Sequence, residues 1–369
     1  MKVTMSTHAQ YLRITTAAAA GLVCASMSLA QNYIEPPTNA FLDGIPIPIM
    51  KTMDQVEPRT VVTSLPYTIS APGSYYAASP LRGCPASNGI TIAASHVRLD
   101  LSGFPVEGVS NSLSGIAVVG EQNNIEIRNG IVCNWGMFGI DAAGHAKDIS
   151  VVEIKAYGNG AGGIYVGENS YVGRCVAMNN GFFVPPTNPP PTDGIQAGSY
   201  STIQDCKARH NKGANIHGYN YTRIAGCTAS ESTEANGIWA EMYCTIRDCV
   251  AAANFSHGIR VGSRCRVVDN TFADNGIMHP ATNAAGISVE GSNNFIERNI
   301  LAGNDIGILV ANMPSNPPTG NLIINNAATK NGIDYQILAP NNFSGPVDSF
   351  QTGQFTNSNP WTNFKFSQF

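Results

Sequence analysis

Acidic, aromatic and basic side chains, which can bind or cleave a ligand, recur in this sequence two and four residues after a regularly repeated residue that is nearly always glycine. The first position holds acidic, aromatic and basic residues, at Asp141, Tyr165, Gln196, His217, Trp239 and Arg260. The second position, two residues later, holds Tyr219, Glu241 and Glu290. Aromatic faces can stack on sugar rings while flanking polar groups bind hydroxyls or carboxylates. The set therefore has the composition of a polysaccharide-binding groove, and we expect a polysaccharide or other glycan as the partner.

Four of these residues are candidates for catalysis, namely Glu241, Glu290, Arg260 and His217. If successive units stack at about 4.8 Å, Glu241 and Glu290 lie roughly 9.5 Å apart, at the upper edge of the spacing in inverting glycosidases. A β-elimination instead needs a base near a sugar C5 and a cation or metal beside the uronate. Arg260 or His217 can fill such a role.

The other members of the set are candidates for substrate binding, namely Tyr165, Gln196, Tyr219, Trp239 and Asp141. No stacked cluster of aspartates indicates a calcium site. We therefore expect neither a metal nor a cofactor.

The elements that must position these residues come from an internal repeat. A Gly-Ile pair opens a segment at Gly89, Gly115, Gly139, Gly163, Gly194, Gly237, Gly258, Gly286, Gly307 and Gly332, and Asn215-Ile216 fills the remaining gap. Successive spacings run from 21 to 31 residues, so the basic unit is 21 residues long. A second pattern runs in phase, as in Val172-Cys175-Ala177-Asn180. Eight consecutive units carry it, two of them with one substitution, at Ile154 and Ser232.

Each unit is built for strands rather than helices. Its opening segment alternates apolar and outward-facing residues, as in residues 258–261, and no 3.6-residue period appears. Three short strands fit in 21 residues, joined by corners rich in Asn and Gly, which tolerate left-handed backbone angles. Equivalent positions then stack into three parallel sheets. The sequence predicts an all-β fold, a right-handed single-stranded parallel β-helix of about eleven turns with N- and C-terminal caps.

These repeats resemble the pectin-lyase-like right-handed β-helix superfamily. The segments Ser64–Ile69, Pro72–Tyr76 and Asn359–Phe364 further resemble the ends of exported bacterial β-helix proteins of undefined activity. The resemblance covers residues 55–369 and implies the fold, but the fold hosts lyases, hydrolases, epimerases and adhesins alike. His257 lies in a stretch similar to the Gly-His-Gly motif of polygalacturonases. The Asp-Asp pair and the Arg-Ile-Lys motif of that family are missing, so we expect His257 at a corner.

The chain divides into four segments. Residues 1–30 have a basic front with Lys2 and Arg13, an Ala-rich apolar stretch and small residues before Gln31, which predicts a signal peptide. Residues 31–88 form a leader and N-terminal cap, residues 89–333 the repeats, and residues 334–369 a C-terminal cap docked by Trp361. The apolar stretch is too short to span a bilayer, and no later segment can do so. We expect a periplasmic or secreted protein.

Composition excludes several other classes of protein. Only 12% of residues are charged and 8% aromatic, while 43% are hydrophobic and 37 are glycine. Such a chain favours neither a helical bundle nor a coiled coil, and it has enough apolar residues for a core. The net charge of −4 disfavours binding to phosphate backbones, so we expect no nucleic-acid partner. The sequence leaves the oligomeric state open.

Cysteines follow the repeat in two sets, Cys175, Cys206, Cys227 and Cys249 in one and Cys244 and Cys265 in the other. Adjacent turns put their Cα atoms about 4.8 Å apart, within disulfide range, but parallel side chains do not favour closure. A ladder of buried thiols and one or more disulfides between turns therefore both remain open. The long spacings hold insertions at residues 182–193, 277–285 and 312–320, and we expect them to border the face that carries the chemistry.

Three functions remain compatible with this sequence. The protein is a polysaccharide-active lyase or hydrolase, a glycan-binding protein without catalysis, or a structural solenoid on a cell surface. The outward-facing aromatic and charged side chains and the insertions beside them favour the enzyme and the glycan-binding protein.

Overall fold

The structure is a computed structural model that describes residues 41–42, 45–46, 58–183, 190–276, 283–311, 315–350 and 358–366. It divides into two units, Met1–Pro58 and Arg59–Phe369. In the first unit, β1 (Phe41–Leu42) pairs antiparallel with β2 (Ile45–Pro46). The predicted signal peptide, residues 1–30, lies outside the described residues.

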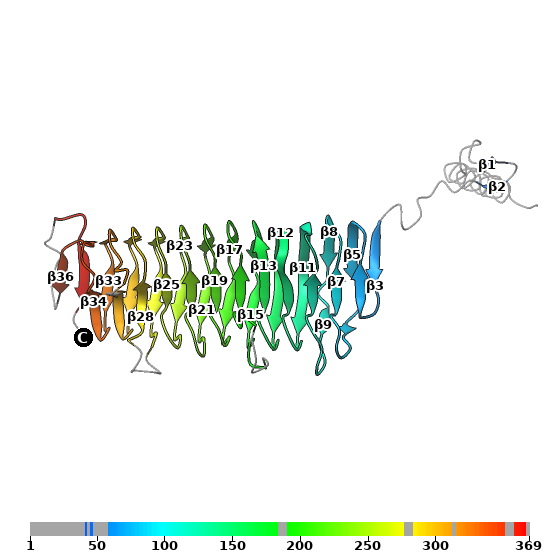
Figure 1. The fold of residues 1–369 in the computed structure, drawn as a ribbon, viewed down its shortest axis with the longest axis horizontal. Coiled ribbons are helices and arrows are strands. Elements are labelled where there is room, and N and C mark those ends of the chain that lie inside the picture. The colour runs from blue at the N-terminus through cyan, green and yellow to red at the C-terminus, as the bar shows by residue number, and fades with distance from the viewer. Residues whose placement is uncertain are drawn as a thin grey trace, which may run out of the picture. The chain divides into compact units, whose positions relative to one another are not determined.

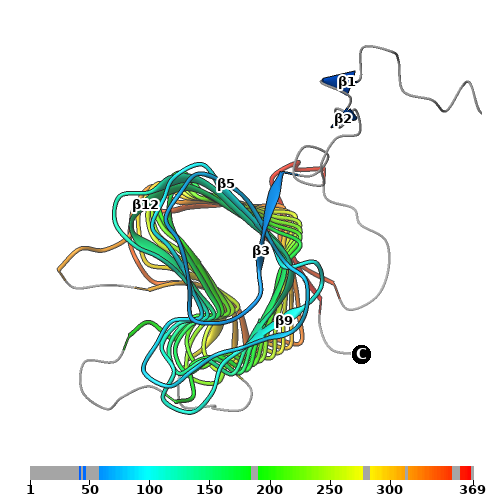
Figure 2. The same cartoon turned by 90° about the vertical axis from the view of Figure 1, so that its right-hand side faces the viewer.

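The second unit is a coil of short parallel strands. Figure 1 shows the strands of successive turns side by side along the axis, and Figure 2, along the axis, shows the turns superposed around a common interior. The prediction of an all-β, right-handed parallel β-helix of about eleven turns is confirmed. Among the described residues there is no helix long and apolar enough to cross a membrane.

Three parallel sheets run the length of the coil. The first sheet contains β4 (Tyr67–Ile69), β7 (Ile90–Ile92), β10 (Ile116–Val118), the start of β12 (Ile140–Tyr157), β13 (Ile164–Glu168), β16 (Ile195–Ala197), β19 (Ile216–Gly218), β22 (Ile238–Ala240), β25 (Ile259–Val261), β28 (Ala285–Val289), β31 (Ile306–Val310) and β34 (Ile333–Ile337).

The second and third sheets share two long strands that turn the corner between them. The second contains β3 (Arg59–Val62), β5 (Gly73–Ala77), β8 (Val97–Asp100), β11 (Asn123–Cys133), the middle of β12, β14 (Tyr171–Gly173), β17 (Thr202–Gln204), β20 (Arg223–Ala225), β23 (Thr245–Arg247), β26 (Arg266–Val268), β29 (Phe295–Glu297), β32 (Leu322–Ile324) and β35 (Phe343–Ser344). The third contains β6 (Leu81–Arg82), β9 (Pro105–Glu107), the ends of β11 and β12, β15 (Val176–Met178), β18 (Lys207–Arg209), β21 (Thr228–Ser230), β24 (Val250–Ala252), β27 (Thr271–Ala273), β30 (Ile300–Ala302), β33 (Ala327–Thr329), β37 (Asn363–Phe366) and β36 (Val347–Phe350).

Isoleucines of the Gly-Ile pairs form the core of the first sheet. Ile164, Ile195 and Ile216 are register partners in consecutive turns and are fully buried. Because side chains alternate across a strand, the residue after each of these isoleucines points outward on the same sheet. The stacked core therefore fixes which residues line the outer face.

A ladder of buried asparagine amides supports one corner of the coil. Each Nδ2 donates to Oδ1 of the next member at 2.8–3.0 Å, through Asn159, Asn180, Asn211, Asn254, Asn275, Asn304 and Asn331, with one additional member between Asn211 and Asn254. That member is Asn215, which fills the place left by Ser232 in the same turn. In other turns a side chain at the Gly-Ile glycine would collide with the ladder, as at Gly237, where a Cβ would lie 2.5 Å from the Asn254 amide. The Gly-to-Asn and Asn-to-Ser changes of this turn therefore compensate for each other.

The described cysteines are free thiols in the structure. Cys175, Cys206, Cys227 and Cys249 are buried in consecutive turns. Cys206 Sγ donates to the backbone carbonyl of Val172 in the preceding turn at 3.5 Å and accepts from the Cys175 N–H. The thiols thus take the place of the amides that follow them in the same ladder, beginning at Asn270.

The corner after the first sheet carries an exposed tyrosine row, Tyr200, Tyr221 and Tyr243. All three have left-handed backbone angles, with φ of 62°, 59° and 59°. Their rings stack at 4.8 and 4.5 Å. Bulky residues rarely adopt this conformation, and the stacking of their rings helps to hold the three corners in register.

The ends of the second unit continue the coil. Strands β4, β5 and β6, from the region predicted as a cap, pair in parallel with β7, β8 and β9 and add a further turn. At the other end Asn363 accepts the Asn326 amide at 3.1 Å and completes a ladder. Trp361, expected to dock the C-terminal cap, is 56% exposed. The expectation for Trp361 is wrong, because the Asn363 amide forms the buried contact.

Candidate functional site

The candidate residues lie side by side on the outer face of the first sheet. As the repeat predicts, the register makes neighbours in successive turns of Asp141, Tyr165, Gln196, His217, Trp239, Arg260 and Ser288. The second row follows the strand ends, with Tyr219 after β19, Glu241 after β22 and Glu290 after β28.

His217 lies at the centre of this face, buried and held between two carboxylates. Its side chain is 5% exposed. Nδ1 lies 3.0 Å from Oδ2 of Asp193, and Nε2 lies 3.7 Å from Oε1 of Glu241. At that longer distance Nε2 has no hydrogen-bond partner, although the atom is buried. One nitrogen is thus fixed and the other is left for a further contact.

The charges of this cluster support one another. Burial lowers the pKa of His217, but the carboxylates of Asp193 and Glu241 together outweigh burial and raise the pKa above 6.5. The imidazole in turn lowers the pKa of Glu241 below 4.5. The cluster therefore favours a protonated imidazole beside an ionised Glu241.

Stacked groups hold the imidazole in place. The His217 ring lies 4.2 Å from the Trp239 ring at 3° and 4.7 Å from the Tyr219 ring at 20°. In the next turn the guanidinium of Arg260 lies 4.8 Å from the centre of the Trp239 ring. Since His217 and Arg260 precede and follow Trp239 in the row, they cover its two faces. Neither face of Trp239 is therefore free to stack on a ligand.

Each of the two predicted catalytic glutamates has its own cation. Arg260 Nη2 lies 2.5 Å from Oε2 of Glu290, while Glu241 lies beside His217. The structure thus groups Glu241 with His217 and Glu290 with Arg260. Their joint action as a glycosidase pair stays a prediction.

The earlier turns carry the remaining candidates. Gln196 Nε2 donates to the Tyr219 hydroxyl at 3.0 Å, and Gln196 Oε1 is buried without a hydrogen-bond partner. The Tyr165 ring lies 5.5 Å from that of Phe138. Burial raises the pKa of Asp141.

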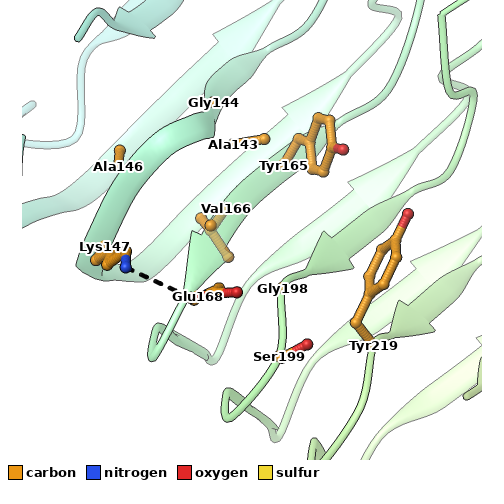
Figure 3. Close-up of a pocket in the computed structure, with 11 residues that line it drawn as sticks. Ala143, Gly144, Ala146, Lys147, Tyr165, Val166, Glu168, Gly198, Ser199 and Tyr219 are labelled. Atoms are coloured by element: carbon orange, nitrogen blue, oxygen red, sulfur yellow. Dashed lines mark ion pairs between the residues drawn. The ribbon is translucent and has the colours of Figure 1, made fainter. Parts of the chain in front are cut away.

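Two hollows lie on the two sides of the row of residues that contains His217, although His217 itself lines neither. The hollow at the strand ends, about 370 Å³, is lined by the rings of Tyr165 and Tyr219, by Lys147 and Glu168, and by backbone around Gly167 (Figure 3). The hollow at the strand starts, about 300 Å³, has as its main lining residues Asp193, Glu234, Trp239, His257, Arg260 and Glu290. Hollows on both sides of a charged centre give a chain-like ligand room to lie across the sheet.

Asp193 is missing from the residues predicted for the site. It comes directly before Gly194, as His257 comes before Gly258. The residue before each Gly-Ile pair is thus a third position facing this side, and comparing that position across the repeat could have found Asp193. His257 instead accepts the backbone N–H of Ala285 at 2.9 Å, and burial lowers its pKa to about 4.

The predicted insertions lie partly outside the described residues, which omit 184–189, 277–282 and 312–314. The described end of the first insertion, Asp193, borders the candidate site. In the part of the chain that the structure describes, no three His, Cys, Asp or Glu side chains are placed to hold a metal ion. The absence of a metal and of a cofactor stays a prediction.

Two comparisons bear on the fold. Residues 187–289 match the protein family described as the right handed beta helix region. The Dettilon tailspike protein has a similar structure, with a TM-score of 0.54 and 15% identity. The chain has the pectin-lyase-like right-handed β-helix fold. The alignment covers 84% of this β-helix protein and 61% of the tailspike chain, so it spans less than two thirds of the tailspike.

More distant structural likenesses include two enzymes. The A-module of the Azotobacter vinelandii mannuronan C-5 epimerase AlgE4 has a TM-score of 0.48 at 16% identity, covering 74% of the β-helix chain and 91% of the module. The catalytic domain of a GH87 alpha-1,3-glucanase has a TM-score of 0.45 at 14% identity, and the alignment covers 77% of the β-helix chain and 61% of the glucanase chain. No curated protein matches the sequence.

Proposed function

We propose that this protein is exported, binds a polysaccharide across the outer face of the first sheet, and cleaves it as a lyase or glycoside hydrolase. The cluster of Asp193, His217 and Glu241 carries the proposal. A buried imidazole with a raised pKa, between two carboxylates and two hollows, suits proton transfer. The β-helix does not need a charged group at the position of His217, because the equivalent positions near its two ends are Thr91 and Leu309.

The pKa shifts support roles for two residues. His217, whose pKa is raised, donates the Nε2 proton to the glycosidic oxygen as the bond to the anomeric carbon breaks. Glu241, ionised, lies 3.7 Å from Nε2 of His217, too close to act on the opposite side of the sugar, and it helps to keep the imidazole protonated. Arg260 remains charged and cannot act as a base, so with Glu290 it orients the sugar. These roles replace the expectation that Arg260 or His217 is the base.

Sugar binding is proposed for the hollow at the strand ends. Tyr165 and Tyr219 line it, and Gln196 is hydrogen-bonded to the Tyr219 hydroxyl. Aromatic rings beside polar groups fit the alternating apolar and hydroxyl surfaces of a sugar. Export is proposed from the predicted signal peptide, and it places the protein in the periplasm or outside the cell.

A glycan-binding protein without catalysis is the second candidate. It is favoured by the small exposure of His217, 5%, and by the rings stacked against its imidazole, which limit access to the proposed acid. Such a protein would use the same hollows for recognition alone.

The substitution Glu241→Gln separates the two candidates. Glycan-array binding and product release are measured for the protein without residues 1–30 and for this variant. Catalysis predicts lost product release with retained binding, because Gln keeps the shape but carries no charge to keep His217 protonated. Glu153→Gln is the control, since Glu153 is paired with Arg174 away from the first sheet. No saturable binding of any glycan would reject both candidates.

A further inference from the structure

The outer face of the first sheet carries more acids than bases. The hollow at the strand starts is lined by the carboxylates of Asp193, Glu234 and Glu290 and by the guanidinium of Arg260. His257, also in its wall, is neutral at ordinary pH because burial lowers its pKa to about 4. The wall of this hollow therefore holds three carboxylates and one guanidinium.

The cations that border the two hollows already have carboxylate partners. The ion pairs are Arg260–Glu290 at 2.5 Å, Lys212–Glu234 at 3.8 Å, Lys147–Glu168 at 3.7 Å, and His217 with Asp193 and Glu241 at 3.0 and 3.7 Å. A ligand carboxylate would have to displace one of these acids from its cation. For the more buried pairs, Arg260–Glu290 and His217–Asp193, the displaced acid would then lie unpaired beside a second negative charge, which is costly. The Lys147–Glu168 pair is more than half exposed, so its displacement costs little.

Two buried polar atoms on this face lack hydrogen-bond partners, Oε1 of Gln196 and Nε2 of His217. Both residues are nearly fully buried, at 3% and 4% exposure. An amide oxygen can only accept a hydrogen bond, and a sugar hydroxyl can donate one, whereas an ionised carboxylate cannot. The vacant acceptor of Gln196 therefore also fits a hydroxyl.

We infer that the polysaccharide bound on this face is neutral, built of sugars without carboxylate groups, and is held through its hydroxyls. This inference rests on the proposed function and narrows it. A β-elimination needs a carboxyl group to acidify the sugar C5–H. A neutral chain therefore leaves hydrolysis as the reaction. The leaving oxygen takes the His217 proton, the water oxygen bonds to the anomeric carbon, and the proton that this water loses restores the imidazolium.

Calorimetric titration tests the inference with two sets of probes. The neutral set is hexasaccharides of glucose, mannose and galactose, and the acidic set is hexamers of galacturonate and mannuronate, each with EDTA and again with calcium. We expect at least tenfold tighter binding of a neutral hexasaccharide than of either uronate hexamer. Glu290→Gln frees Arg260, and we expect at least a tenfold gain in affinity for a uronate hexamer. The control Glu153→Gln frees Arg174 away from this face and should give no such gain.

The outcomes separate this inference from the function on which it rests. Uronate binding by the unaltered protein as tight as neutral binding, with or without calcium, would overturn the inference and leave glycan binding in place. A neutral preference without a gain in Glu290→Gln would overturn the ion-pair explanation. No saturable binding of either set would reject the proposed function itself.

Discussion

The substitution Asp193→Asn removes one charge beside the His217 imidazole while keeping the side-chain shape. Asp193 Oδ2 lies 3.0 Å from His217 Nδ1, and the two side chains are 13% and 5% exposed. Water screens such a pair weakly, so its loss should be measurable. We expect the pKa of His217 to fall in this variant.

The size of the fall follows from the hydrogen bond that loses its charge. A hydrogen bond to a charged group contributes about 1.5–3 kcal/mol, and one pKa unit corresponds to about 1.4 kcal/mol, so the pKa of His217 should fall by roughly one to two. Burial is the largest single influence on this pKa and opposes protonation. Glu241, at 3.7 Å, then remains as the other carboxylate beside the ring. We therefore expect the pKa of His217 in the variant to lie below that in the unaltered protein.

An NMR titration of histidine-labelled protein measures this pKa directly. The chain has seven histidines, and the His217 signal is assigned by its loss in His217→Gln. Asp248→Asn is the matched control, because Asp248 pairs with Arg247 on an exposed corner. An unchanged His217 pKa in Asp193→Asn, or a pKa below 6.5 in the unaltered protein, would refute the description of the charged cluster.

Stability should follow the same shift. In the unaltered protein the His217 pKa is higher in the folded state than in the unfolded state. The stability from its protonation is therefore full below about pH 6.5 and is lost as the pH rises through the folded-state pKa. In Asp193→Asn this contribution should shrink, because the pKa of His217 moves back toward its value in the unfolded state. Relative to His217→Gln, the thermal unfolding midpoint of the unaltered protein should fall as the pH rises through this range, and that of Asp193→Asn should depend on pH less steeply.

Three further predictions concern the coil. Ser232→Asn should lower the free energy of unfolding by about 1–3 kcal/mol, because the new amide would crowd Asn215 in the ladder. Adding Asn215→Gly should restore most of this loss. If thermal unfolding shows that the two substitutions each destabilise and that their effects add, the proposed compensation is contradicted. Gly237→Ala should cost a similar amount, about 1–3 kcal/mol, because its Cβ would lie 2.5 Å from a ladder amide, whereas Gly144→Ala, with no atom within 4 Å, should leave the unfolding midpoint nearly unchanged. In a thiol titration of the native protein without residues 1–30, Cys84 should react rapidly and the buried cysteines only after unfolding; a second rapid thiol would contradict their burial.

The coil was predictable because the same inward position is filled in nearly every unit. Counting from the Gly-Ile pairs gave the outward row, and register pairs such as Gln196 with His217 and Trp239 with Arg260 follow it. Local periodicity suffices for such a fold, since each turn contacts only its neighbours.

The partners within the site were less predictable. Asp193 follows an insertion of irregular length, so its distance from His217 in the sequence does not show that the two side chains meet. The covered faces of Trp239 depend on how three side chains in consecutive turns orient, which composition does not reveal. The two carboxylates that raise the His217 pKa likewise come from different turns.

The turn that contains Asn215 and Ser232 was likewise not predictable from the sequence. Asn215 and Ser232 each look like an isolated departure from the repeat in the sequence. Only the three-dimensional contact, in which Asn215 bridges Asn211 and Asn254, shows them to be one paired change.

The most direct test of glycan binding on the first sheet compares two tyrosine variants on a glycan array. Tyr165 lines the hollow at the strand ends of the first sheet, whereas Tyr200 belongs to the exposed tyrosine row at the corner. We predict saturable binding of a neutral glycan that falls at least tenfold in Tyr165→Ala and persists in Tyr200→Ala. Absence of binding, or loss of binding in Tyr200→Ala with retention in Tyr165→Ala, would contradict the assignment of the site to this face.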